Sequence, residues 1–118
     1  MNQESPIFEE IRNAVTNNDV ALFMKGNKSF PQCGFSSAVV HVLQTLNVDF
    51  ADYNVLDSME LREAIKIFSD WPTIPQLYVK GEFIGGCDII REMTESGELQ
   101  SLFNEKGISY SAPQDAAL

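Results

Sequence analysis

A cysteine and a serine at the spacing of a redox pair, Cys33 and Ser36, are the residues that point most directly to chemistry. Two cysteines in these positions, beside a strand, helix and strand unit, would be able to close a disulfide with each other. Ser36 cannot form that bond. A thiol from outside the motif must therefore complete any disulfide exchange at Cys33, or the thiol must serve a different chemistry.

The position of Cys33 between a loop and a predicted helix favours its ionised form. Unsatisfied N–H groups at a helix N-terminus and the nearby Lys25 and Lys28 both stabilise an anion there. The thiolate is the reactive nucleophile and also the metal ligand. The alternative is an inert, buried cysteine, a common state of free Cys. The Lys, Pro and Gly residues around Cys33 argue against it.

The periodicity of apolar residues and the turn residues between them indicate alternating strands and helices. Strands are predicted over residues 20–24, 49–55, 76–79 and 82–84. Helices are predicted over about 6–16, 34–46, 59–69 and 88–96, with a last helical turn or two over 99–103. The first two strands and the helix between them form a parallel unit, and the last two strands form a hairpin. This order predicts an α/β thioredoxin fold, in which helices flank both faces of a four-stranded mixed sheet.

Turn and capping residues mark the ends of these elements. Asn47 is expected to end the helix that follows Cys33. Either Asp57 or Ser58 is expected to cap the next helix, and Asp88 the one after it. Gly in the second position of the two-residue turn 80–81 is typical of a tight hairpin.

Composition limits the domain count and the partners. The 118 residues, 44% of them hydrophobic, fit one domain over 1–108, and the small, polar segment 109–118 is predicted to be a disordered tail. Two distant cysteines without a secretory leader favour the reducing cytoplasm. The net charge of -9 argues against nucleic acid as a partner. No apolar stretch approaches the roughly 20 residues that a membrane span needs, so no membrane association is expected.

Four motifs along the chain resemble the signature of the monothiol glutaredoxins that carry a Cys-Gly-Phe-Ser site. They are residues 25–26, 31–36, 71–76 and 85–88, and the resemblance spans about 20–103. The chain departs from the family pattern at Asn27-Lys28, where the family usually has Thr or Ser followed by Pro. The loop thereby loses the fixed φ of Pro and gains a cation, which affects how Lys25 is held.

The resemblance implies a glutathione site. Its implied residues are Lys25, Arg62, Thr73, Ile74, Pro75, Cys87 and Asp88. In the family the two cations hold the carboxylate of the glycine end, and the backbone before a cis Pro75 pairs with the backbone of glutathione. The helix start at Asp88 holds the γ-glutamyl end.

Plainer roles remain open for three of these residues, and a fourth residue outside the set, His41, has no implied role. Arg62 could be a solvated helix residue, and Asp88 a simple helix cap. Cys87 is interpreted first as a small packing residue, although in the family its backbone contacts glutathione and its thiol can act as a secondary partner of Cys33. The lone His41 is interpreted as a surface residue of a helix.

Two functions fit the same thiolate. The resemblance implies an iron-sulfur carrier, in which Cys33 from each of two protomers and two glutathione thiolates ligate a 2Fe-2S cluster for transfer to apo iron-sulfur proteins. It also implies a heterodimer with a BolA-type protein. The alternative is a glutathione-dependent thiol-disulfide oxidoreductase with Cys33 as its only nucleophile, a cycle that Ser36 permits.

Overall fold

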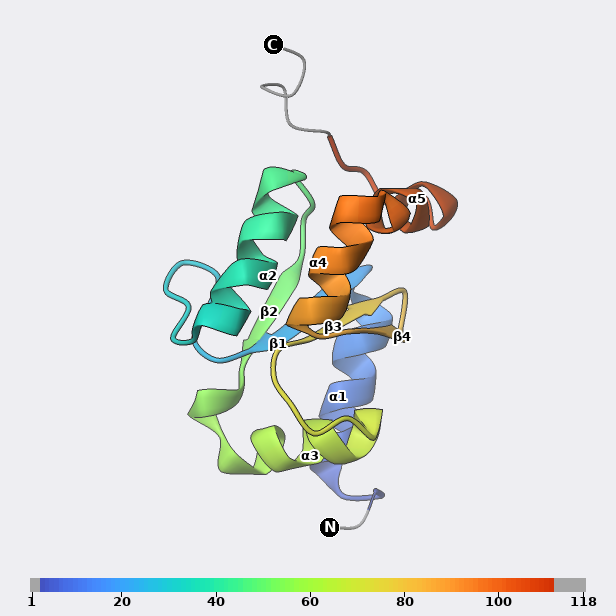
Figure 1. Ribbon diagram of the computed structural model, residues 1–118. Helices are drawn as coiled ribbons and strands as arrows, with labels where there is room; N and C mark the ends of the chain where they lie inside the picture. The colour runs from blue at the N-terminus through green and yellow to red at the C-terminus, as the bar shows by residue number, and fades with distance from the viewer. Residues whose placement is uncertain (1–2, 112–118) are drawn as a thin grey trace.

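A four-stranded sheet lies at the centre of the molecule with helices on both of its faces (Figure 1). The computed structural model describes residues 3–111. Its elements are α1 (Pro6–Asn17), β1 (Val20–Met24), α2 (Gly34–Thr45), β2 (Ala51–Asn54), the 3-10 helix η1 (Val55–Asp57), α3 (Met59–Ser69), β3 (Gln76–Val79), β4 (Glu82–Gly85), α4 (Cys87–Ser96) and α5 (Glu98–Glu105).

The strand order is β2-β1-β3-β4, which confirms the predicted thioredoxin fold. β1 pairs with β2 in parallel, and with β3 in the antiparallel direction. β3 and β4 form the predicted hairpin, in which Lys80 and Gly81 both have positive φ, of 52° and 82°. Positive φ at both central residues is the geometry of the turn that follows the right-handed twist of paired strands.

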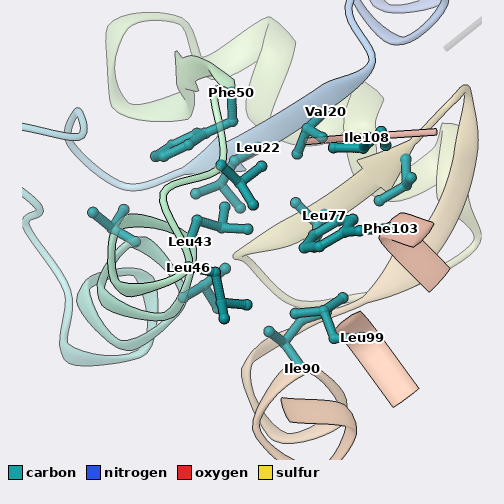
Figure 2. Packing of buried hydrophobic residues seen from close by; sticks show 14 of the residues in the cluster. Val20, Leu22, Leu43, Leu46, Phe50, Leu77, Ile90, Leu99, Phe103 and Ile108 are labelled. Atoms are coloured by element: carbon teal, nitrogen blue, oxygen red, sulfur yellow. The ribbon is translucent and has the colours of Figure 1, made fainter. Parts of the chain in front are cut away.

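Burial of β1 on both faces explains why its sequence is continuously apolar. Val20, Leu22 and Met24 face one core cluster, beneath α2 and α4, and Figure 2 shows part of its packing. Ala21 and Phe23 face the second cluster, beneath α1 and α3. Because successive side chains of a strand point to opposite faces, a strand between two layers of helices needs apolar residues at every position.

One predicted helix cap is confirmed and another is wrong. Ser58 caps α3, and its hydroxyl accepts a hydrogen bond from the Leu61 N–H at 3.1 Å. Asp88 does not cap α4, because the helix begins one residue earlier and Gly86 is its N-cap. A Cβ on Gly86 would lie 3.0 Å from the Pro75 carbonyl oxygen, so the close approach of two loops determines this boundary.

Two further segments also differ from prediction. α5 has the one or two turns expected but runs over 98–105, three residues longer than the predicted 99–103, and its Leu99 and Phe103 are fully buried in the first core cluster. The segment predicted as a tail begins at Ser109, yet the Ser111 N–H donates to the Leu46 carbonyl at 2.8 Å and Tyr110 packs on Phe103. The rest of that segment, 112–118, lies outside the described residues. Across residues 3–111, every helix is too short or too polar to cross a membrane.

Candidate functional site

A groove of about 470 Å³ opens beside Cys33, where the loops at one end of the sheet meet. The residues implied by the sequence all line it, and they are Lys25, Cys33, Arg62, Thr73, Ile74, Pro75, Cys87 and Asp88. They come from the ends of β1 and α2, from α3, from the loop before β3 and from α4. The tertiary structure therefore brings together segments that are separated by up to 63 positions in the chain, from residue 25 to residue 88.

Cys33 is the N-cap of α2 and its side chain is partly exposed. The backbone N–H of Ser36 has the largest effect on the Cys33 thiol and lowers its pKa. Partial burial opposes this effect, whereas the Phe35 N–H, the Lys25 ammonium and the Ser36 hydroxyl add to it. The net result is a pKa below the ordinary value of 9.0, in agreement with the expectation that a helix N-terminus favours the thiolate.

The serine of the motif is a packed structural residue. Ser36 is completely buried, and its hydroxyl oxygen accepts a hydrogen bond from the Lys25 N–H at 3.1 Å. This bond connects the first turn of α2 to the end of β1. The hydroxyl thus connects the segment that carries Cys33 to the segment that carries Lys25, a role that the sequence pattern did not indicate.

Hydrogen bonds replace proline as the source of rigidity in the loop 26–32. The Asn27 side-chain oxygen accepts from the N–H groups of Ser29 and Phe30, both at 2.9 Å. The Lys28 N–H donates to Asp52 at 2.8 Å. The Lys28 ammonium donates to the Phe50 carbonyl and lies 4.3 Å from the centre of the Phe50 ring. The charge of Lys28 is therefore directed at Phe50, just before β2, and the expectation that it assists the Cys33 thiolate was wrong.

Three cations line the groove, and the sequence analysis identified only two of them. Lys66 lies one helical turn after Arg62 on α3, so the i, i+4 spacing was the available signal. The Arg62 Nε atom is buried and has no hydrogen-bond partner among the described residues. Buried N–H groups are rarely left unpaired, and an unpaired guanidinium N–H at a groove suits the carboxylate of a ligand.

The loop before β3 lines the groove with residues 71–75. The bond between Ile74 and Pro75 is cis, as the resemblance implied. The Ile74 side chain is buried in the second core cluster, and its N–H donates to no group within residues 3–111. A backbone N–H at a groove surface without a protein partner is available to an extended ligand.

The remaining site residues divide into buried and exposed groups. Cys87 is 8% exposed and belongs to the first core cluster, so its packing role is confirmed. Asp88 is exposed in the first turn of α4. Two aromatic side chains on the groove rim, Phe35 at 62% and Trp71 at 42% exposure, were not singled out from the sequence. Nothing in the local pattern distinguishes an aromatic residue on a rim from one in the core.

Comparison with known proteins identifies close relatives of this chain. A sequence model of the family Glutaredoxin matches residues 20–84. "Probable monothiol glutaredoxin 2" of Rickettsia conorii is 57% identical over 99 residues, which cover 84% of this chain and 92% of that protein. "Monothiol glutaredoxin-5, mitochondrial" of Saccharomyces cerevisiae is 56% identical over 102 residues, which cover 84% of this chain and 68% of that protein.

Two solved structures agree with these relatives. The solution structure of reduced poplar apo GrxS14 superposes with a TM-score of 0.78 at 47% sequence identity, over 89% of this chain and 97% of that chain. The truncated 1-C-Grx1 of Trypanosoma brucei has a TM-score of 0.81 at 38% identity, over 86% of this chain and 93% of that chain.

Proposed function

This chain belongs to the glutaredoxin family, in its monothiol branch, and on that premise we propose that it binds glutathione in the groove beside Cys33 and carries 2Fe-2S clusters. The observation that carries the proposal is the groove itself. It combines a thiol of lowered pKa with a buried, unpaired Arg62 N–H and the free N–H of Ile74. A peptide with a thiol in its middle and carboxylates at its ends matches that arrangement.

The groove offers a partner for each part of glutathione. Lys25, Arg62 and Lys66 supply positive charge for the glycine carboxylate. The backbone of Ile74 is available to pair with the peptide backbone of the ligand. The first turn of α4, which contains Cys87 and Asp88, supplies N–H groups for the γ-glutamyl end. Thr73 and Pro75 complete the wall beside the bound peptide.

Cluster binding follows from counting thiolates. A 2Fe-2S cluster requires four ligands, and Cys33 is the one thiol that both borders the groove and reaches solvent in the described chain. No three His, Cys, Asp or Glu side chains within residues 3–111 are grouped to hold a metal. We propose that two protomers and two glutathione molecules supply the four thiolates, which makes the cluster a transferable cargo.

The partners and compartment of this activity are part of the same proposal. A cluster half ligated by a diffusible tripeptide can pass to apo iron-sulfur proteins, and a BolA-type protein would replace one protomer in a heterodimer. The proposed compartment is the cytoplasm, because two unpaired cysteines suit a reducing environment.

Anaerobic reconstitution with iron, sulfide and glutathione tests the carrier function. The expected product is a coloured dimer whose formation requires glutathione, observed by visible absorption and by mass. The Cys33→Ser variant is expected to remain colourless and monomeric, whereas the control variant Cys87→Ser should retain the colour because that thiol is buried. A colourless wild-type protein under these conditions would refute the proposal.

The lowered pKa and partial exposure of Cys33 also favour a second function, reduction of glutathione mixed disulfides. The Cys33 thiolate would attack the glutathione sulfur, form a protein-glutathione disulfide and release the substrate as a thiolate. A second glutathione thiolate would then attack the same sulfur, yielding oxidised glutathione and free Cys33. Rapid turnover of a glutathionylated peptide by a protein that binds no cluster would make this the main activity.

A further inference from the structure

A buried glutamine binds the loop that lines the groove. Gln76, the first residue of β3, is 0% exposed. Its side-chain nitrogen donates to the carbonyls of Trp71 at 3.1 Å and Thr73 at 3.2 Å. Its side-chain oxygen accepts from the Tyr78 hydroxyl at 3.2 Å. Three hydrogen bonds thus fix one amide between the loop and the core.

The chemistry of the partners allows only one orientation of this amide. The two loop carbonyls can only accept hydrogen bonds, so the Gln76 nitrogen must face them. The oxygen then faces Tyr78, which must donate. Tyr78 keeps its proton, because burial raises its pKa. Gln76 and Tyr78 are two residues apart on one strand, so their side chains emerge on the same face of the sheet.

Holding the Thr73 carbonyl also determines where the next N–H points. The peptide between Thr73 and Ile74 is trans, and in a trans peptide the C=O and the N–H point in opposite directions. Since the carbonyl is drawn toward Gln76 in the interior, the Ile74 N–H is directed away from the interior. This N–H has no partner among the described residues, and Ile74 is one of the residues that line the groove.

We propose that Gln76, oriented by Tyr78, is a positioning residue for glutathione, because its amide fixes the Thr73–Ile74 peptide with the Ile74 N–H toward the ligand. The inference rests on the proposed glutathione site and adds a determinant of affinity that touches no ligand atom. The bond to the Trp71 carbonyl extends the effect to α3, because the Trp71 N–H donates to the Lys66 carbonyl at 3.1 Å.

The test compares two amide-to-acid substitutions of nearly identical shape. In Gln76→Glu, an acid replaces the amide that holds the loop: the ionised form cannot donate, and the protonated form can donate to only one of the two loop carbonyls. The matched control is Asn18→Asp, because the Asn18 nitrogen also donates twice, to the Ala14 carbonyl at 2.8 Å and to the Tyr53 hydroxyl at 2.9 Å. Asn18 precedes β1 and borders a different pocket, away from Cys33.

The measurements are the dissociation constant of S-methylglutathione and the amide NMR shift of Ile74 on binding. Gln76→Glu is expected to weaken binding about tenfold, the size of one buried hydrogen bond lost, and to reduce the Ile74 amide shift at saturation. Asn18→Asp is expected to bind within about twofold of wild type with a normal Ile74 shift. Wild-type affinity and a normal Ile74 shift in Gln76→Glu would overturn the inference.

A second variant decides the question if Gln76→Glu does not fold. Tyr78→Phe leaves both bonds from the Gln76 nitrogen possible but removes the donor that orients the amide. We expect binding about threefold weaker than wild type, and unchanged binding would overturn the inference. Failure of the wild-type protein itself to bind S-methylglutathione would refute the proposed function, and this inference with it. Binding by wild type with unaffected variants would refute the role of Gln76 alone.

Discussion

Replacing the buried serine of the motif, Ser36→Ala, should destabilise the fold while leaving the acidity of Cys33 nearly unchanged. The substitution removes the only acceptor that residues 3–111 offer to the Lys25 N–H, the hydroxyl of a side chain that is 0% exposed. An unsatisfied buried donor costs about 2 kcal/mol, and the better helix propensity of Ala returns about 0.5 kcal/mol, for a net loss of about 1.5 kcal/mol. With an unfolding entropy of about 0.25 kcal/mol/K for 118 residues, Tm should fall by about 6 °C.

The adjacent serine provides the control. Ser37 lies in the same turn of α2, but its side chain is exposed and its hydroxyl makes no hydrogen bond to a described residue. Ser37→Ala therefore carries the same gain in helix propensity without the loss, so the two variants should differ by about 2 kcal/mol in urea unfolding under reducing conditions. Equal stability of the two variants would refute the structural role of Ser36.

Ser36→Ala also separates the contributions that the backbone N–H and the hydroxyl of residue 36 make to the lowered pKa of Cys33. The backbone N–H of Ser36 is the main cause of the lowered Cys33 pKa, and its hydroxyl is the smallest. Because Ser36→Ala keeps the N–H, the pH dependence of Cys33 alkylation should move upward only slightly. A profile that returns fully to that of an ordinary thiol would show that the hydroxyl, and not the backbone, controls the acidity.

Three further predictions concern the groove and its loop. In the folded protein, Cys33 alkylation should reach half its maximal rate below pH 9.0, because folding lowers the pKa of the thiol. The ionised thiol therefore contributes to the stability of the fold, fully above the unfolded pKa and less as the pH falls through the folded pKa. An alkylation profile equal to that of the unfolded chain would contradict this. Arg62→Gln should weaken glutathione binding about tenfold, whereas the exposed Arg91→Gln should not, and equal affinities would exclude Arg62 from the site. Gly26→Ala should lower the free energy of unfolding by about 3 kcal/mol, because φ is +89° and the added Cβ would lie 2.5 Å from the Phe30 carbonyl oxygen; wild-type stability would show that the loop can rearrange.

Most of the fold was predictable because its signals are local. The continuous apolar run of β1, the Gly-containing turn at 80–81 and the stop at Asn47, with φ of 55°, each follow from a few neighbouring residues. The boundaries that were wrong depend on distant contacts. Gly86 caps α4 because the Pro75 loop approaches it, and residues 109–111 contact the core through Leu46 and Phe103.

The site shows the same division. The sequence by itself determined that a single reactive thiol begins a helix, that its usual partner is absent, and which motifs accompany it, because these are properties of residue type and order. Only the tertiary structure decided that Ser36 is buried and binds the Lys25 N–H, that the Lys28 ammonium binds the Phe50 carbonyl, and that Gln76 holds the loop before β3. Each of these depends on which side chains meet across the sheet, since a polar residue's partner is chosen by packing among segments that are remote in the sequence.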